Sequence, residues 1–582
     1  MRMVKNWLRY SILLVWVCCL MQPVFCAEEE VLPVVEMSAD RVTIYPQRME
    51  LNGEETLFDI LQLYPAILTN AYDNWLDNWE IRIDNGPYGG DMRVLLNEMK
   101  AYRIKKVQIS DAPGVAKGTT GTKRVVDVFL MPLEQGAHGT ISAELSQNVS
   151  TTSFAELRYG SKNTDILANA SYSFVPLNPY DNHKQFSNFH MVNQLGEKDQ
   201  LVTYFTQSYE RTREMLANPT NVDYLYARCD NREFYGQLRN YHYFRPEMFL
   251  MSALVYYYGR SPRVTTLYPE DRLRDSLSNG KTHIFAAVEE FNATFFDRLN
   301  LMAGVEVDYA MDKQDYFYPE NMSRVDHKAN SLYGDLYVEL DYTLNKWRFT
   351  AGDRLRYQRV HGWWETYPNP TEFLNHYPLN MMHASVIYTP HREHQIQLAY
   401  LQKYVRPSYE QALSDITYIH EVKLAYNFAR PNVSAGLNAY YYNFNYQNDQ
   451  HHDFLIDASA RYHYRFLTVN GGVNIRINDN PSQPRTASAA FSLAPVFDIP
   501  YGMQLRARTI FYTPSSSLRR YNMATLAYNA WVTDYITRYI YRPVYGELQF
   551  TKFWPHLDLY ALWHDIFNGS YGIATLGLRV KM

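Results

Sequence analysis

From about Ala137 to the C-terminus, the chain is a succession of segments in which apolar and polar residues alternate. In the segment Asn432–Asn443, one face would carry the apolar residues Val433, Ala435, Leu437, Ala439 and Tyr441. The other face would carry Ser434, Gly436, Asn438, Tyr440 and Tyr442. A period of two residues predicts β-strands whose two sides meet different surroundings.

Composition narrows the kind of β protein. Mean hydropathy is only −0.40, yet the chain contains 51 Tyr, 28 Phe and 10 Trp. Beyond the N-terminal segment, no apolar run approaches the roughly 18 residues that a membrane helix needs. A transmembrane barrel combines these properties, because only every second residue faces lipid and aromatic girdles mark both interfaces. We therefore predict an antiparallel transmembrane β-barrel over residues 137–582.

Connections between the alternating segments alternate in length. Short ones such as Leu344–Lys346 and Thr389–Arg392 predict periplasmic turns. Longer ones at Arg260–Gly280, Asp312–Ala329 and His361–Pro378 predict external loops. There are 22 or 23 candidate strands, with the ambiguity between residues 521 and 554, and the preference for even numbers favours about 22. An array of secreted β-sandwiches is the alternative, but no linker or repeat of about 100 residues supports it.

The first 27 residues predict a secretory signal peptide, with basic residues before an apolar run from Ile12 to Leu20. Three of the four cysteines lie within this segment, so Cys229 has no partner for a disulfide. The formal net charge of −5 and the lack of a basic tract give no indication of nucleic-acid binding. We expect an exported protein.

Residues 41–136 predict a small α/β domain ahead of the barrel. Glu55–Tyr64 has the apolar spacing of a short helix that ends at Pro65, and Met92–Tyr102 predicts a second helix. Strands are predicted at Trp79–Asp84 and at two further sites, Ile104–Ile109 and Arg124–Leu130.

The loop between the last two of these strands is rich in glycine and basic residues. Its notable members are Gly114, Lys117, Gly118, Gly121, Lys123 and Arg124. A phosphate-binding loop would need G-x-x-x-x-G-K-[ST] opening into a helix, whereas this spacing differs and an alternating strand follows. The pattern favours a tight connection between strands over a nucleotide site.

This order of elements resembles the plug domain of TonB-dependent outer-membrane receptors, especially their compact Bacteroidetes branch. The plug passages that carry the likeness are Ile104–Ile109, the D-A-P-G turn and Arg124–Leu130. Two barrel passages, His394–Tyr409 and Asp558–Asn568, are similar to family strands. The chain departs from the family in lacking an N-terminal carboxypeptidase-regulatory-like domain and the usual Gly-Gly of the plug loop.

The resemblance implies a receptor that imports an extracellular ligand, sits in outer-membrane lipid and is energised by the TonB–ExbB–ExbD complex. The expected TonB box lies in residues 28–40, where the candidates are Glu30, Val31, Leu32, Val34 and Val35. An unstructured leader is the alternative for this segment. The alternative function is a plugged barrel that serves as a structural or partner-binding surface component. We expect no enzyme, no cofactor and no metal site, and the sequence does not identify the ligand.

Charged residues on two predicted barrel strands share the inner face. The acids are Asp335, Glu339 and Asp341, and the bases are Arg348, Arg354 and Arg356. Catalytic carboxylates are one interpretation, but ion pairs that fix register or hold the plug are favoured, with Lys117, Lys123 and Arg124 as plug partners for the acids. Trp363, Trp364 and Tyr367, in a predicted external loop, are candidates either for stacking on a ligand or for an interface girdle.

Overall fold

A computed structural model shows a barrel with a small domain inside it. It describes residues 35–37, 41–48, 55–61, 79–84, 86–87, 95–96, 99–110, 114–115, 124–131, 133, 135–146, 151–177, 180–217, 224–268, 274–296, 298–318, 323–365, 371–391, 393–405, 416–430, 432–446, 449–479, 486–512, 544–554, 557–564 and 573–581. In this described part of the chain, no helix is long and apolar enough to cross a membrane.

Twenty-two antiparallel strands, β7 to β28, form the closed barrel, in which the last strand pairs with the first. Their bounds are β7 Gly136–Ser146, β8 Thr151–Gly160, β9 Thr164–Leu177, β10 Tyr180–Gln194, β11 Asp199–Ala217, β12 Tyr224–Arg245, β13 Met248–Tyr268, β14 Arg274–Phe295, β15 Leu299–Tyr318, β16 Ser323–Leu344, β17 Trp347–Glu365, β18 Thr371–His391, β19 His394–Val405, β20 Thr417–Ala429, β21 Val433–Tyr446, β22 Asp449–Tyr464, β23 Leu467–Asp479, β24 Thr486–Ile499, β25 Met503–Tyr512, β26 Val544–Phe553, β27 Leu557–His564 and β28 Ile573–Lys581. The predicted fold class and a strand number of 22 are confirmed.

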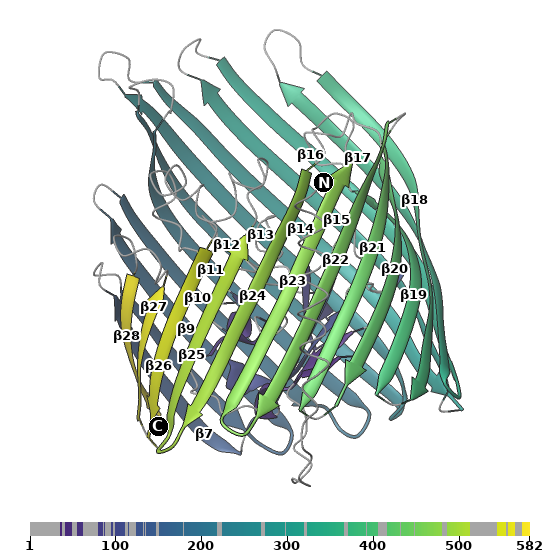
Figure 1. Cartoon of the computed structure of the whole chain (residues 1–582). Coiled ribbons are helices and arrows are strands. Elements are labelled where there is room, and N and C mark those ends of the chain that lie inside the picture. The colour runs from purple at the N-terminus through teal and green to yellow at the C-terminus, as the bar shows by residue number, and fades with distance from the viewer. Residues whose placement is uncertain are drawn as a thin grey trace, which may run out of the picture.

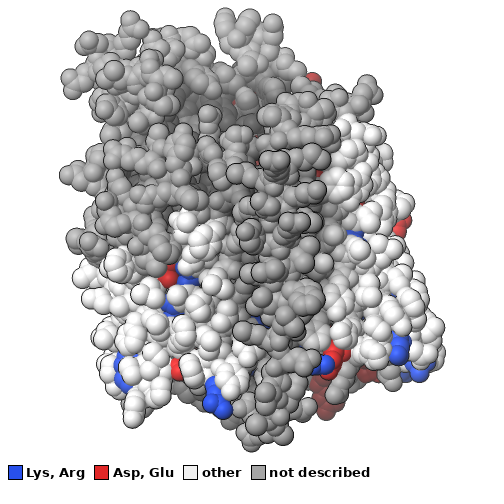
Figure 2. Space-filling model, in the orientation of Figure 1, with Lys and Arg blue, Asp and Glu red and all other residues white. Residues whose placement is uncertain are grey.

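The two faces of the strands differ as the alternation predicts. In β21, Ser434, Asn438 and Tyr440 are buried, whereas Leu437 between them is exposed. In β16, Asp335 is buried and Leu336 is exposed. Most of the described surface visible in Figure 2 is uncharged, with charged side chains gathered toward one rim. The apolar face therefore points outward and the polar face lines the lumen.

The prediction of long external loops is wrong. Residues 260–280, 312–329 and 361–378 are largely the ends of paired strands, so that β14 and β16 each reach 22 residues and β13 and β18 each reach 21. Figure 1 shows these strands rising above the yellow C-terminal strands, of which β27 has only eight residues. Backbone pairing continues beyond the level where the apolar alternation stops, because the ladder hydrogen bonds do not depend on lipid.

A six-stranded sheet inside the barrel forms the plug, shown in purple in Figure 1. Its strands lie in the order β1-β2-β5-β6-β3-β4, and only β3 and β6 pair in parallel. Their bounds are β1 Val35–Met37, β2 Val42–Ile44, β3 Trp79–Ile83, β4 Gly86–Pro87, β5 Ile104–Ser110 and β6 Arg124–Leu130. The sheet packs with two barrel residues, Tyr204 and Tyr235, in one apolar core.

The structure changes the predicted end of the second plug helix. The first helix, α2, covers Leu57–Leu61, and two 3-10 turns cover Pro46–Arg48 (η1) and Ala101–Arg103 (η4). The predicted second helix does not continue to Tyr102, because Lys100 forms a bridge with Thr56. Backbone hydrogen bonds from Leu57 to Met99 (2.7 Å) and from Ala101 to Glu55 (2.7 Å) hold this segment beside the first helix.

The segment proposed as a TonB box is only partly described. Val35 belongs to β1, which pairs with β2 at the edge of the plug sheet, and its side chain is buried. Glu30, Val31, Leu32 and Val34 lie outside the described residues, as does the predicted signal peptide. The described part of the candidate is therefore already a plug strand.

Candidate functional site at the plug and barrel interface

Inward-facing charges from β15, β16 and β17 form a buried polar cluster against the plug. Asp335 is bound by both Arg354 and Arg356, and Arg354 also binds Glu306 of β15. The side chain of Asp335 is fully enclosed, and those of both arginines are nearly so. Asp341 lies apart and accepts from Arg348 at 2.8 Å. Asp335 and Asp341 thus form ion pairs with the three arginines, and Glu306 is a further member that sequence reasoning did not single out.

The turn that follows β5 fits directly onto this cluster. A Cβ atom on Gly114 would overlap the carboxylate of Glu339, and one on Gly352 would lie 2.5 Å from a methyl group of Val115. Arg354 donates to the carbonyl of Val115 at 3.4 Å. A glycine on each side thus lets the plug backbone and the barrel wall approach closely.

An apolar patch completes this contact. Val115 packs with Leu379 and Met381 of β18 and with Tyr404 of β19, all of them buried. The same plug residue therefore combines a hydrogen bond to a buried arginine with apolar packing. This fixes the position of the turn more narrowly than either interaction alone.

Replacement of Gly352 by alanine is expected to weaken this contact. The added methyl group would meet Val115 and also the backbone oxygen of Val338 at 3.0 Å, and overpacking of this kind costs about 1–3 kcal/mol. We expect more frequent channel openings in planar bilayers. Gly334→Ala on β16 is the matched control, since nothing lies within 4 Å of its Cβ position. The double variant Gly352→Ala/Val115→Ala should restore the closed state, and equal openings in both single glycine variants would contradict the fit.

A second contact joins the start of β6 to β22. Arg124 donates to Asp457 at 2.8 Å, and both side chains are buried. Asn474 of β23 also donates to Asp457. The expectation that Arg124 would pair with the acids of β16 is thus wrong, because β6 begins beside β22 and not beside β16. Lys117, Gly118, Gly121 and Lys123 lie outside the described residues.

A third contact holds the turn after β3. The carbonyl oxygen of Asp84 accepts from Arg239 at 2.5 Å and from Tyr241 at 2.9 Å, both on β12. Its carboxyl oxygen accepts from the backbone of Leu130 at 3.0 Å. Burial raises the pKa of the Asp84 carboxyl, an effect that this backbone donor and Arg239 partly offset.

Two more contacts involve acids that sequence reasoning did not single out. Glu156 of β8 accepts from Tyr102 at 2.6 Å and lies 3.9 Å from Arg103. Glu55 of the plug binds Arg506 of β25. Each barrel residue occupies an inward position in the alternation, which identifies its face. No sequence signal indicates which of the many inward polar residues meets the plug.

The structure favours one of the two roles considered for Trp363. This residue lies within β17, not in a loop, and its Cα partner on β16 is Lys328. The Lys328 ammonium lies 5.3 Å from the centre of the Trp363 ring, and the alternation places both residues on the outer face. That position suits an interface girdle. The side chain of Trp364 and all of Tyr367 lie outside the described residues.

The interface is thus a set of polar contacts around the plug, from β8, β12, β17, β22 and β25. Water can replace such contacts one by one, whereas separating an apolar interface would expose apolar surface to water at a cost in free energy. Within the described ranges, no group of three His, Cys, Asp or Glu residues is placed to hold a metal ion. The arrangement is suited to holding and releasing a domain.

Comparisons with solved structures identify the fold. The alcaligin outer-membrane receptor FauA from Bordetella pertussis superposes with a TM-score of 0.66 at 12% identity, covering 94% of this chain and 95% of that one. The copper transporter OprC gives 0.70 at 9% identity, with 96% and 100% covered. The siderophore receptor PiuA from Acinetobacter baumannii gives 0.70 at 9% identity, with 96% and 99% covered.

Comparisons of the sequence alone find no relative. No family model matches the chain, and no curated protein matches it. The likeness is therefore one of architecture, preserved over nearly the whole length of both chains. This chain has the plugged 22-strand barrel fold of TonB-dependent outer-membrane receptors, the family whose plug its sequence resembles.

Proposed function

We propose that this protein imports a polar extracellular ligand across the outer membrane, and that energy from a TonB complex displaces the plug. The observation that carries the proposal is the set of polar contacts that holds the plug inside the barrel. A barrel used only as a wall component has no need of a lumen domain fixed by separable contacts. The similar receptors for siderophores and copper support metal chelates as the first ligands to test.

The N-terminal edge of the plug is the natural place for the pulling force to enter. β1 holds only three register pairs with β2 and also lies against β20 and β21. Chain that precedes Val35 would pull on this edge strand first. Because a β-ladder yields most easily from its end, force here would separate β1 before the rest of the sheet.

Deleting residues 28–34 tests energisation while leaving β1 in place. Uptake of labelled ferric or cupric chelates should fall to the level of a strain without the protein, because the site for the energising partner is gone. A matched control replaces the same residues by a Gly/Ser segment of equal length and should behave alike. Surface abundance of the barrel should not change, and continued uptake by the deletion variant would refute energisation through this segment.

The tall hairpins favour a second candidate function. Strands β11 to β18 have 19 to 22 residues each, more than the 9–11 that cross a membrane. They extend on one side of the barrel and offer a surface for a partner protein (Figure 1). Loss of a surface complex after shortening the outer ends of the β13–β14 or β15–β16 hairpins, without any loss of uptake, would favour this role.

A further inference from the structure

Five basic residues occupy one register line across neighbouring barrel strands. Arg232 of β12 is opposite Arg260 of β13, which is opposite Lys281 of β14. Lys281 is opposite Lys313 of β15, which is opposite Lys328 of β16. We call these five residues the basic row.

The basic row lies on the outer surface of the barrel. Residues of the same parity on these strands are exposed apolar ones, among them Leu254, Phe285, Val305 and Leu336. Residues of the opposite parity, such as Tyr235, pack against the plug. The row is therefore not part of the plug interface and takes no part in holding the plug.

The level of the row matches the outer edge of the membrane. It lies roughly 12 to 16 residues from the periplasmic turns, about 30–40 Å at 3.3 Å per residue and a tilt of about 40°. The apolar band of such barrels is about 25 Å tall. Aromatic residues follow immediately on the membrane side of the row, namely Phe234, Tyr256, Tyr258, Phe285 and Tyr309. This is the height of lipid headgroups in the outer leaflet.

Like charges directly opposite each other on one face of a sheet destabilise it unless something compensates them. Lys313 pairs with Asp315 at 3.1 Å. The structure records no ion pair for Arg232, Arg260 or Lys281 within the described residues, and Arg260 donates only to Asn279 at 3.3 Å. The nearby carboxylate of Asp230 is bound by other arginines, Arg211 and Arg228. Three adjacent cations thus share one side of the row without a carboxylate.

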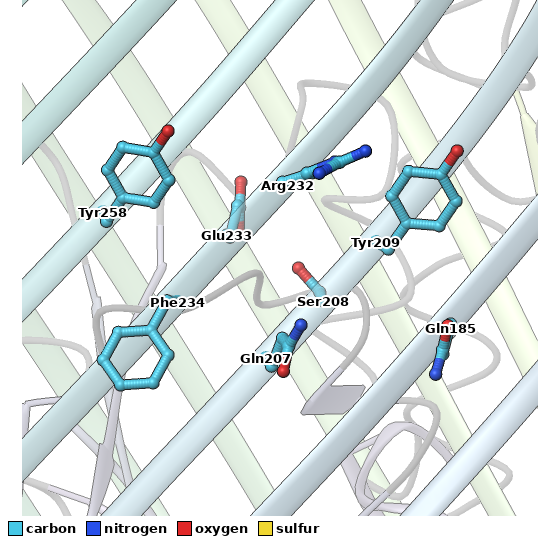
Figure 3. Close-up of a pocket in the computed structure, with 8 residues that line it drawn as sticks. All are labelled: Gln185, Gln207, Ser208, Tyr209, Arg232, Glu233, Phe234 and Tyr258. Carbon is cyan, nitrogen blue, oxygen red and sulfur yellow. The ribbon is translucent and has the colours of Figure 1, made fainter.

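A pocket of about 460 Å³ opens beside the first member of the row. Figure 3 shows Arg232 beside Tyr209, with Phe234 and Tyr258 along the other side. The guanidinium carbon of Arg232 lies 5.5 Å from the centre of the Tyr209 ring. A cationic group above aromatic side chains suits a molecule with an anionic head and an apolar body.

We propose that the basic row binds the phosphate groups of an outer-leaflet glycolipid of the lipid A class. Arg232, Arg260 and Lys281 would hold the phosphates, and the acyl chains would lie over the aromatic residues on the membrane side. Arginine is well suited to such a ligand because its planar fork matches phosphate oxygens. The lipid would supply the negative charge that the row lacks.

The test compares lipid binding by the full-length protein and by the variant Arg232→Gln/Arg260→Gln/Lys281→Gln. The probe is bisphosphorylated lipid A in mixed detergent micelles, with its dephosphorylated form as a second ligand. At roughly 1 kcal/mol for each basic residue near an anionic surface, affinity should fall about 100-fold in the triple variant. Dephosphorylated lipid should bind the unchanged protein with similarly reduced affinity.

A matched control removes three charges from the periplasmic turns, with Lys346→Gln/Arg430→Gln/Arg465→Gln, and should bind like the unchanged protein. Equal affinity in both triple variants would overturn the proposal. Displacement of the lipid by millimolar inorganic phosphate would also overturn it, because the site would then recognise the free anion. Heat-modifiable mobility on gels reports folding of each variant, and the single variant Arg260→Gln, with a fall of about fivefold, provides the test if the triple variant misfolds.

Discussion

Deletion of residues 28–130 is expected to leave a barrel that inserts into the membrane and conducts ions through an open lumen. The 22 strands close on themselves through β28 and β7 without any plug strand, so the wall does not need the plug for its hydrogen bonds. Many of the inward side chains that now contact the plug are polar, and water can solvate them in its absence. Planar-bilayer recordings should show large, stable conductance steps.

The deletion of residues 28–34 is the control for this experiment. Both variants lack the proposed energising segment, yet only the larger deletion lacks the plug sheet. Ligand uptake by the energised route should be lost in both variants, whereas large conductance should occur only in the 28–130 deletion. A closed pore in the 28–130 deletion would mean that the barrel collapses or that other residues block it.

Replacement of Asp335 by alanine is expected to have the largest effect of any single substitution. Its carboxylate compensates both Arg354 and Arg356, and removing one partner of a buried charge cluster costs about 3–5 kcal/mol. Because Arg354 also donates to the Val115 carbonyl, the loss should reach the plug contact. The temperature at which the compact form is lost on gels should fall by several degrees, and channel openings should become more frequent.

Asp341→Ala serves as the comparison, because it also removes a carboxylate from β16 but from a separate ion pair, the one with Arg348. Asp341 binds Arg348 where the arginine side chain is 31% exposed, and such partly solvated pairs contribute about 1 kcal/mol or less. The Asp341 variant should therefore stay close to the unchanged protein in both measurements. Similar losses in the two variants would show that burial of the Asp335 cluster does not matter.

These expectations follow from the way in which the barrel wall holds the plug. Ion pairs and hydrogen bonds hold the plug from several sides. Apolar packing against the wall joins the plug core to Tyr204 and Tyr235, and Val115 to its neighbours on β18 and β19. A domain held in this way can be firm at rest and still be released by force or by entry of water. Under the proposed function, ligand binding and pulling on β1 would act on the same set of contacts.

The sequence predicts the barrel well because the signal is local. Period-two alternation assigns Asp335, Leu336 and Leu437 to the correct faces, and turn chemistry marks short connections such as the one at Asn345, whose φ is 53°. It fails for residues 260–280, because strand pairing above the membrane leaves no apolar pattern. It also extends the second plug helix too far toward Tyr102. Long-range backbone pairing with Glu55 and Thr56 determines the conformation at Lys100 and Ala101.

What the sequence alone determined is which face each strand residue occupies and that a small α/β domain precedes a barrel. Only the tertiary structure decided which residues meet across the lumen, such as Arg124 with Asp457 and Gly114 with Glu339. The same is true of the basic row, whose members are separated by up to 96 positions in the chain and are brought together by strand register. Alternation repeats every two residues and so fixes a side but not a register, which depends on all neighbouring strands and on closure of the barrel.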